Sequence, residues 1–297
     1  MLTRDNATPR RIIVGYTADE RGFESLALAA TIASGTDAEI VVTFVLQEAS
    51  PYTPLQSGDP ILQERLAEWE RAALERVPEG IPATTHVRSA ANRAEGLLDA
   101  AAEHAAELIV IGARRSALLQ QFALGRTANA LLHSSSVPVA LAPAGYRFNG
   151  SVPRVTAVYG TRPGAEAVIG TAVELADELD VPMRLLSLLA SDTRSGLSDQ
   201  LIAEAERFGG DALGNRAGRV LGTDTASIDI VEGGDLDEAA DRATWLDGEL
   251  ALIGSSRLAP RGRVFIGRVA QRLLRSTSAA LIVIPRDYRA ATNERTR

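Results

Sequence analysis

The segment LIVIGARRSALLQQFALGRTANALLHSSSVPVALAP, residues 108–143, has the pattern of a strand, a loop, a helix and a second strand. Its first four residues form a continuous apolar run before Gly112, as expected for a strand buried on both faces of a parallel sheet. A thirteen-residue loop leads to Gly125, and apolar residues then recur at helical spacing over Arg126–Ser134. A second short strand is predicted over residues 137–142.

The same pattern returns over residues 250–285, at a constant offset of 142 residues. The matching positions are Gly112 and Gly254, Arg115 and Arg257, Gly125 and Gly267, Arg126 and Arg268, and Pro143 and Pro285. Agreement over this length without a gap indicates an internal duplication. A period of this size indicates two whole domains rather than a solenoid of small repeats.

Length and composition limit the class of protein. The 297 residues, of which 45% are hydrophobic, allow about two globular domains. The chain has no cysteine, which excludes a disulfide framework and a thiolate metal site. The N-terminal sequence MLTRDNATPRR is polar, and no window approaches the ~18 apolar residues of a membrane span. We therefore expect a cytoplasmic protein without a membrane partner.

Charge is distributed unevenly along a chain whose net charge is −7. Residues 108–165 contain six arginines and no acid, and residues 250–286 contain seven arginines and no acid. The duplicated unit is therefore expected to form a basic patch on an acidic body. A nucleic-acid partner is not expected, because aromatic residues are few, no binding motif is present and the acidic body would repel phosphate backbones.

Strand and helix patterns alternate in both halves of the chain. In the first half, strands are expected over residues 11–16, 39–46 and 83–88, and helices over 23–34, 61–77 and 93–107. Gly35 is expected to end the first helix. In the second half, strands are expected over 155–159, 182–189, 227–231 and 280–284, and helices over 164–179, from near 198, and to 243 after the N-cap Asp235.

This alternation predicts an α/β fold with a mostly parallel sheet in each half. The segment AGYRFNGSVP, residues 144–153, has the Gly, Asn and Pro content of a linker. The predicted domains are therefore residues 1–144 and 154–290.

Both halves resemble the universal stress protein family, and the resemblance covers nearly the whole chain as a tandem pair. In that family a strand ending in Asp, a glycine after strand 4 and a G-x2-G-x9-G-[S/T] loop surround a nucleotide, usually ATP. The outer glycines of the loop are kept in both halves, as Gly112 with Gly125 and as Gly254 with Gly267. The departures are Arg115 and Arg257 at the middle glycine, Arg126 and Arg268 at the terminal hydroxyl, and Thr17 and Gly160 at the acidic position.

The resemblance implies binding of ATP or a related nucleotide, with or without Mg²⁺. Small glycines admit phosphate to backbone N–H groups, and a helix N-terminus adds about half a positive charge. The replacements leave two alternatives open, since Arg115 and Arg257 either clamp a phosphate or fill the pocket. Thr127 either donates a hydroxyl one position late or simply starts the helix. Loss of the Asp removes the contact implied for the adenosine end, so the ligand class includes other phosphorylated anions.

The resemblance also implies an architecture. Each half is expected to form a doubly wound five-stranded sheet of order 3-2-1-4-5, and the two halves are expected to form a pseudo-dimer. The fifth strands, residues 137–142 and 280–284, are expected to meet, which would cover their apolar edges. Whether the tandem chains also form a homodimer is left open.

Signatures of catalysis are few. His86, His104 and His133 are far apart in the sequence and do not have a metal-binding spacing, so they are expected to be structural or surface residues. Neither a nucleophile elbow nor a Walker A motif is present. No catalytic residue and no metal ligand is therefore nominated. The expected function is regulatory, stress-linked binding of a nucleotide or another phosphorylated anion. The alternatives are a ligand-free scaffold with arginine-filled pockets and a slow nucleotide hydrolase.

Overall fold

A computed structural model of the chain describes residues 10–47, 60–115, 122–123, 125–148, 150–160, 165–190, 207, 226–255, 270–273, 277, 279–285 and 288. The first half contains β1 (Arg11–Gly15), α1 (Glu20–Thr36), β2 (Glu39–Gln47), α2 (Pro60–Leu74), β3 (Ala83–Ala90), α3 (Arg93–Glu103), β4 (Leu108–Gly112), β5 (Arg114–Arg115), β6 (Phe122–Ala123), α4 (Arg126–Ser134) and β7 (Val139–Ala142). The second half contains β8 (Val155–Tyr159), α5 (Ala165–Leu179), β9 (Met183–Ala190), β10 (Ala226–Gly233), α8 (Leu236–Arg242), β11 (Leu250–Gly254) and β12 (Ala280–Ile284). The helix expected near residue 198 lies outside the described residues.

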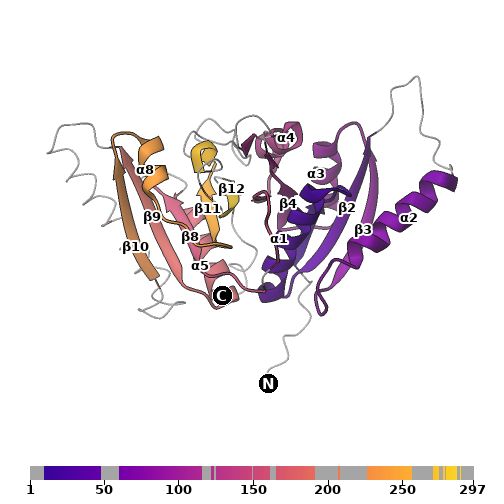
Figure 1. The fold of residues 1–297 in the computed structure, drawn as a ribbon, viewed down its shortest axis with the longest axis horizontal. Coiled ribbons are helices and arrows are strands. Elements are labelled where there is room, and N and C mark those ends of the chain that lie inside the picture. The colour runs from indigo at the N-terminus through magenta and orange to yellow at the C-terminus, as the bar shows by residue number, and fades with distance from the viewer. Residues whose placement is uncertain are drawn as a thin grey trace.

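A single ten-stranded sheet runs through both halves, in the order β10-β9-β8-β11-β12-β7-β4-β1-β2-β3. Within each half the strands are parallel and have the predicted order 3-2-1-4-5, which confirms the expected fold class. The fifth strands β7 and β12 pair antiparallel, with Val139 opposite Val283 and Leu141 opposite Leu281. Figure 1 shows the two halves side by side, joined where the magenta and yellow parts of the chain meet. The predicted junction of the fifth strands is confirmed.

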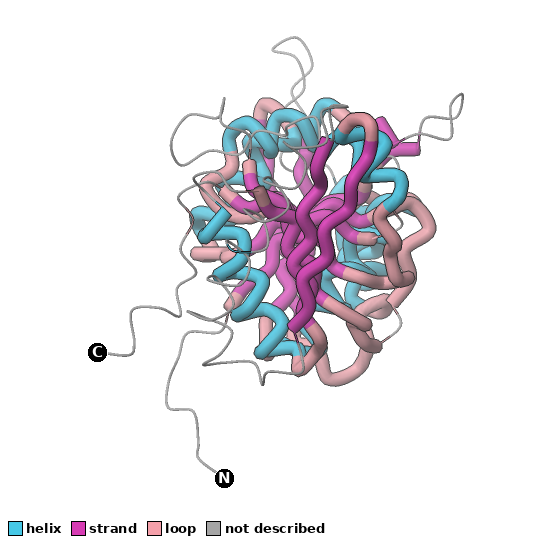
Figure 2. Tube along the Cα trace, turned by 90° about the vertical axis from the view of Figure 1, so that its left-hand side faces the viewer, coloured by secondary structure: helices cyan, strands magenta, loops and turns pink. Residues whose placement is uncertain are grey.

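Helices cover both faces of this sheet (Figure 2). One buried cluster contains residues of α1 and α5, and the other contains residues of α3, α4 and α8. Both clusters extend across the junction, since Ala140 and Ile282 belong to the first, and Val139 and Val283 to the second. The two halves therefore share one hydrophobic core on each side of the sheet rather than keeping separate cores.

Helix α1 departs from the sequence expectation at both ends. It begins at Glu20, three residues earlier than expected, because the Asp19 side chain accepts a hydrogen bond from the backbone N–H of Gly22 and caps the first turn. The prediction that Gly35 ends the helix is wrong. Asp37, at φ 50°, takes the left-handed position after the helix instead.

Gly35 serves a different purpose, which is contact between the halves. A Cβ on Gly35 would lie 2.5 Å from Cδ2 of Leu179, the last residue of α5. The absence of a side chain thus lets the C-terminal ends of α1 and α5 approach each other. Asp180 follows α5 at φ 52°, just as Asp37 follows α1, so the duplicated helices end in the same way.

Polar contacts also join the two halves. The Arg10 guanidinium donates from Nε to Glu107 of the first half at 2.5 Å, and from Nη1 to Glu178 of the second half. The Gly145 N–H donates to the Glu24 carboxylate at 2.5 Å, which fixes the start of the linker against α1. None of the described helices combines the length and apolar character needed to cross a membrane.

Candidate functional site

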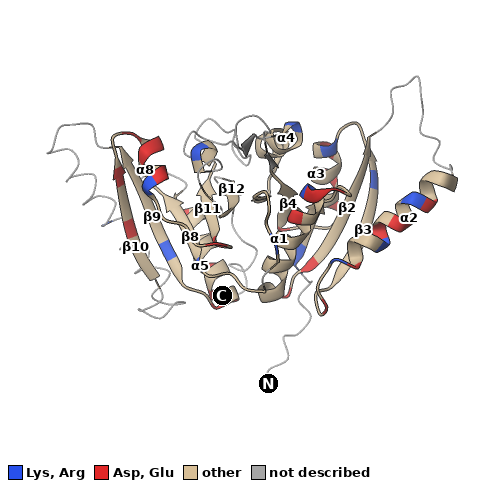
Figure 3. Cartoon of the chain, in the orientation of Figure 1, with Lys and Arg blue, Asp and Glu red and all other residues tan. Residues whose placement is uncertain are grey.

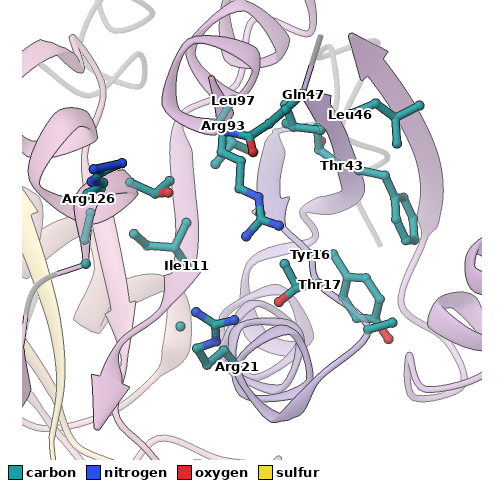
Figure 4. Close-up of a pocket in the computed structure, with 18 of the residues that line it drawn as sticks. Tyr16, Thr17, Arg21, Thr43, Leu46, Gln47, Arg93, Leu97, Ile111 and Arg126 are labelled. Carbon is teal, nitrogen blue, oxygen red and sulfur yellow. The ribbon is translucent and has the colours of Figure 1, made fainter. Parts of the chain in front are cut away.

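A cavity of about 510 Å³ opens at the carboxyl ends of β1, β2 and β4 (Figure 4). Ligands of open α/β proteins bind outside the carboxyl ends of the strands, at the point where the strand order reverses. In this sheet that point lies between β1 and β4. The N-termini of α1, α3 and α4 and one face of α2 complete the wall. The described lining residues are Gly15, Tyr16, Thr17, Ala18, Arg21, Thr43, Phe44, Val45, Leu46, Gln47, Leu66, Trp69, Arg93, Leu97, Ile111, Gly112, Gly125, Arg126, Thr127 and Ala128.

Gly112 lets the N-terminus of α1 pack against the end of β4. A Cβ at Gly112 would lie 2.4 Å from the backbone oxygen of Arg21. No larger residue fits there without displacing the first turn of α1, since that oxygen belongs to the backbone. Gly112 thus positions Arg21 at the floor of the cavity.

The N-cap of α1, Asp19, is held by local hydrogen bonds. Asp19 accepts from Thr17 Oγ1 at 2.5 Å and from Arg21 Nη2 at 2.5 Å, in addition to the Gly22 N–H. Partial burial works to raise the pKa of Asp19, but these hydrogen bonds together hold the pKa below its ordinary value. Asp19 therefore stays ionised, and it serves to cap the helix and hold Arg21 in place.

Helix α4 presents an uncapped N-terminus to the cavity. Its N-cap is Gly125, which has no side chain to accept a hydrogen bond from the first-turn amides. Arg126, Thr127 and Ala128 of this turn all line the cavity. Free N–H groups and the helix dipole at such an end favour an anion.

Three arginines, Arg21, Arg93 and Arg126, line the cavity. Arg21 is paired with Asp19, whereas Arg93 and Arg126 have no acid partner among the described residues. Figure 4 shows Arg93 reaching from the start of α3 toward Thr17 and Arg21. The sequence reasoning missed Arg93. The available signal was its position directly after β3, which places it at the same sheet edge as Thr17 and Gly112.

The opposite wall of the cavity is apolar. It is formed by Phe44, Val45 and Leu46 of β2 with Leu66 and Trp69 of α2. Trp69 remains 38% exposed, so its ring is open to a ligand. The cavity therefore has a cationic end and an apolar end, which is the polarity of a molecule with an anionic group and a flat ring system.

The structure brings together five of the predicted site residues, Thr17, Gly112, Gly125, Arg126 and Thr127. The backbone of Arg115 lies in β5, which pairs with β6 in a small hairpin, while its side chain lies outside the described part. In the second half, Gly160 follows β8 and Gly254 ends the neighbouring strand β11. The remaining predicted residues, Arg257, Gly267 and Arg268, lie outside the described residues.

Two arginines of the predicted basic patch have acid partners in space. Arg154 pairs with Glu249 at 2.7 Å and Arg272 pairs with Asp241, although neither arginine has an acid nearby in its own acid-free segment. Acids distant in sequence therefore reach these arginines in space. Figure 3 accordingly shows red and blue positions interspersed over the two halves.

The described lining residues offer Mg²⁺ no carboxylate, because Asp and Glu are absent among them. Oxygen ligands from carboxylates are what Mg²⁺ usually takes from a protein. The donor set of this cavity thus fits an anion and does not fit a protein-held Mg²⁺.

Fold and cavity together define a duplicated, doubly wound α/β protein with a ligand-sized cavity at the carboxyl edge of its first sheet. The model of the universal stress protein family matches residues 8–143 and 152–285, and the chain belongs to this family. The resemblance inferred from the glycine-framed loops is thus confirmed.

Relatives have the same tandem organisation. A universal stress protein of Mycobacterium tuberculosis is 29% identical over 291 residues, covering 92% of this chain and 99% of the relative. Among solved structures, a universal stress protein from Archaeoglobus fulgidus aligns with a TM-score of 0.62 at 19% identity, covering 93% of this chain and 98% of that one. A putative universal stress protein from Pseudomonas aeruginosa aligns with a TM-score of 0.66 at 17% identity, covering 94% of this chain and 95% of that one.

Gly22 offers a test of how tightly the cavity floor is packed. A Cβ at Gly22 would lie 1.7 Å from the backbone oxygen of Thr17, so the Gly22→Ala variant must displace the loop before α1. Alanine gains about 1 kcal/mol of helix propensity, and we expect the clash to exceed this gain and leave a net loss of about 2 kcal/mol in unfolding free energy. Urea unfolding measures the loss. The control is Gly160→Ala, where no atom lies within 4 Å, and an equal loss there would contradict the packing argument.

Proposed function

We propose that the cavity of the first half binds a nucleotide or another small phosphorylated anion, and that this binding has a regulatory, stress-linked role in the cytoplasm. The observation that supports this is the arrangement of charge. Arg21, Arg93, Arg126 and the uncapped N-terminus of α4 all line the same cavity of about 510 Å³. Cavities of about 300–1,000 Å³ accommodate small ligands and cofactors.

Phosphate would lie at the cationic end. The first-turn amides of α4 would donate to its oxygens, and Arg126 and Arg93 have donors free to do the same. A purine or similar ring would lie against Phe44 and Trp69 at the apolar end. ATP is the ligand that the family resemblance suggests, and the protein's own groups would balance its charge without Mg²⁺.

The open volume among the described residues supports binding, and the side chain of Arg115, which the scaffold alternative places in this pocket, lies outside the described part. In Figure 4 the guanidinium groups of Arg21 and Arg93 lie near the middle of the view, and that of Arg126 lies at the left beside α4. Hydrolysis of a bound nucleotide would need a group that orients or activates water. The described lining residues include no carboxylate or histidine for that task. Binding without turnover is therefore the function that this cavity supports best.

Calorimetric titration of the full chain with ATP, ADP, AMP, adenosine and inorganic phosphate tests the proposal. We expect affinity that requires phosphate, so adenosine should bind weakest. Each of Arg93→Met and Arg126→Met should weaken binding by about 10- to 100-fold, because each removes a charge-assisted hydrogen bond of about 1.5–3 kcal/mol.

The matched control is Arg242→Met, which removes an exposed arginine of α8, in the other half of the protein. Its affinity should equal that of the unmodified chain. Equal weakening in all three variants would indicate a general charge effect rather than a site. Absence of any phosphate-dependent affinity would favour the ligand-free scaffold.

A further inference from the structure

Three potential metal ligands meet on the edge of the first sheet, away from the cavity. They are His86 of the edge strand β3, Glu103 at the end of α3, and His104, which caps that helix. One donor atom from each of the three side chains lies within 4.8 Å of the others. In particular, Nε2 of His86 lies 3.9 Å from Oε2 of Glu103. The topology thus brings together two of the three histidines in the chain, which are 18 positions apart in the sequence.

Both imidazoles have an unused ring nitrogen. Nε2 of His86 and Nε2 of His104 are buried and have no hydrogen-bond partner. Each such buried and unsatisfied group costs about 1–3 kcal/mol, so most proteins avoid it. The two rings meet edge to face, with centroids 4.8 Å apart and an interplanar angle of 85°. Ring packing explains their contact, but it leaves the two nitrogens without partners.

We propose that His86, Glu103 and His104 form a binding site for a divalent transition-metal cation of the Zn²⁺ class. Two imidazole nitrogens and one carboxylate, with a water in the fourth position, are a recurrent zinc ligand set. Mg²⁺ and Ca²⁺ prefer oxygen ligands, so this set discriminates against both.

Small movements of the side chains would complete the geometry. Zinc bonds of about 2.0–2.1 Å in a tetrahedron place the ligand atoms about 3.3 Å apart, so the donors must close by roughly 1 Å. Glu103 can move, because its side chain is 54% exposed. The His104 backbone is held by its N–H donating to Ala100 and by the turn through Ala105 that follows, so its ring would adjust by rotation of the side chain.

Arg88 is the neighbour that competes with a metal. Its Nη1 donates to Glu103 at 2.5 Å and its Nη2 donates to Asp99 at 3.1 Å. A bound cation would share Glu103, while Asp99 keeps Arg88 paired.

This site is separate from the nucleotide cavity, and it stands whether or not a nucleotide binds there. Helix α3 has Arg93 at its start, in the cavity, and Glu103 at its end, in the metal cluster. Ten residues of α-helix separate these positions by about 15 Å.

Titration of the full chain, without a polyhistidine tag and after removal of metals with a chelator, tests the proposal. We expect one equivalent of Zn²⁺ to bind, Mg²⁺ not to compete, and Co²⁺ to give the visible absorption of a four-coordinate site. His86→Ala and His104→Ala should each abolish this binding, whereas His133→Ala should retain it. His133, an exposed residue of α4, is the matched control because it is the remaining histidine. Arg88→Met should tighten Zn²⁺ binding by about tenfold, because it removes a competing positive charge.

Nitrogen-15 spectra of the imidazoles keep the proposal testable if an alanine variant fails to fold. With three histidines in the chain, the signals can be assigned, and Zn²⁺ should shift those of His86 and His104 but not that of His133. Zinc binding that persists in a folded His86→Ala, His104→Ala double variant would overturn the assignment. Absence of a stoichiometric equivalent, or imidazole signals unchanged by Zn²⁺, would also overturn it.

Discussion

Replacing Glu249 with alanine is expected to lower the free energy of unfolding by about 3–5 kcal/mol, because it leaves buried positive charge without a partner. Glu249 is fully buried and precedes β11. One carboxylate oxygen accepts from Arg184 Nη2 at 2.9 Å and from Thr156, and the other accepts from Arg154 Nη2 at 2.7 Å and from the Leu246 N–H at 2.9 Å. Few surface substitutions approach a loss of this size.

Arg184 is the partner of Glu249 that the substitution should destabilise most. Its residue is 1% exposed, and burial lowers the pKa of its guanidinium. Besides Glu249, it donates to Thr156 Oγ1 at 3.0 Å and to the Thr244 carbonyl at 2.9 Å, and it lies 5.0 Å from the centroid of the Trp245 ring. Without Glu249, the main neutralising charge is gone, and Asp229 at 3.5 Å is a poor replacement because its side chain is 46% exposed.

The first half of the same chain provides a natural comparison. Thr156 lies opposite Arg184 on β8 and β9, and the duplicated pair on β1 and β2 is Ile13 opposite Val41. The same fold therefore accepts an apolar pair at these positions. We expect the triple variant Thr156→Ile, Arg184→Met, Glu249→Leu to recover most of the stability lost in Glu249→Ala, since well-packed apolar groups can replace a buried ion pair.

Urea unfolding of Glu249→Ala and the triple variant checks both expectations. If Glu249→Ala lowers the free energy of unfolding by less than about 1 kcal/mol, Glu249 contributes no more than an exposed ion pair does. Such a result would contradict the buried network. If the triple variant is less stable than Glu249→Ala, the network stabilises the fold by more than neutralising its own buried charges.

The fold could be predicted because its signals are local and repeated. Apolar runs such as Ile12–Val14 predict strands, and the alternation with helices limits the sheet to a few topologies. Asp235 was predicted as an N-cap, and its side chain accepts from the Glu238 N–H at 2.8 Å. The failure at Gly35 has a different origin, because a glycine near a helix end looks the same whether it ends the helix or admits Leu179 of another domain.

The candidate site was predicted only in part because distance along the chain hides proximity in space. The loop glycines and Thr17 occupy positions of a recognisable sequence motif. Arg93 follows a different strand and belongs to no such motif. The same limit applies to the His86 and His104 pair, whose spacing matches no helical metal motif. In each case the parallel sheet brings the residues together, and parallel pairing depends on contacts between distant segments.

Substituting Val283 with aspartate is expected to cost about 4 kcal/mol or more, because it introduces an unpaired charge at the junction of the two halves. Val283 is fully buried and lies opposite Val139, which is also fully buried, in the antiparallel pair of β12 and β7. Both belong to the cluster that continues from one half to the other, so water cannot reach the carboxylate without opening the sheet.

The matched control is Val87→Asp, the same change on the edge strand β3, where the side chain is 37% exposed and the edge is unpaired on one side. There the introduced carboxylate stays hydrated, and the cost should be within about 1 kcal/mol, the range of strand propensity. Urea unfolding compares the two variants.

The loss of unfolding free energy in Val283→Asp should also shrink as the pH falls from about 7 to about 4, because burial raises the pKa of the introduced carboxyl and the neutral acid costs less to bury. Equal losses in the two variants, at either pH, would mean that the halves are held together by α1, α5 and Arg10 rather than by the continuous sheet.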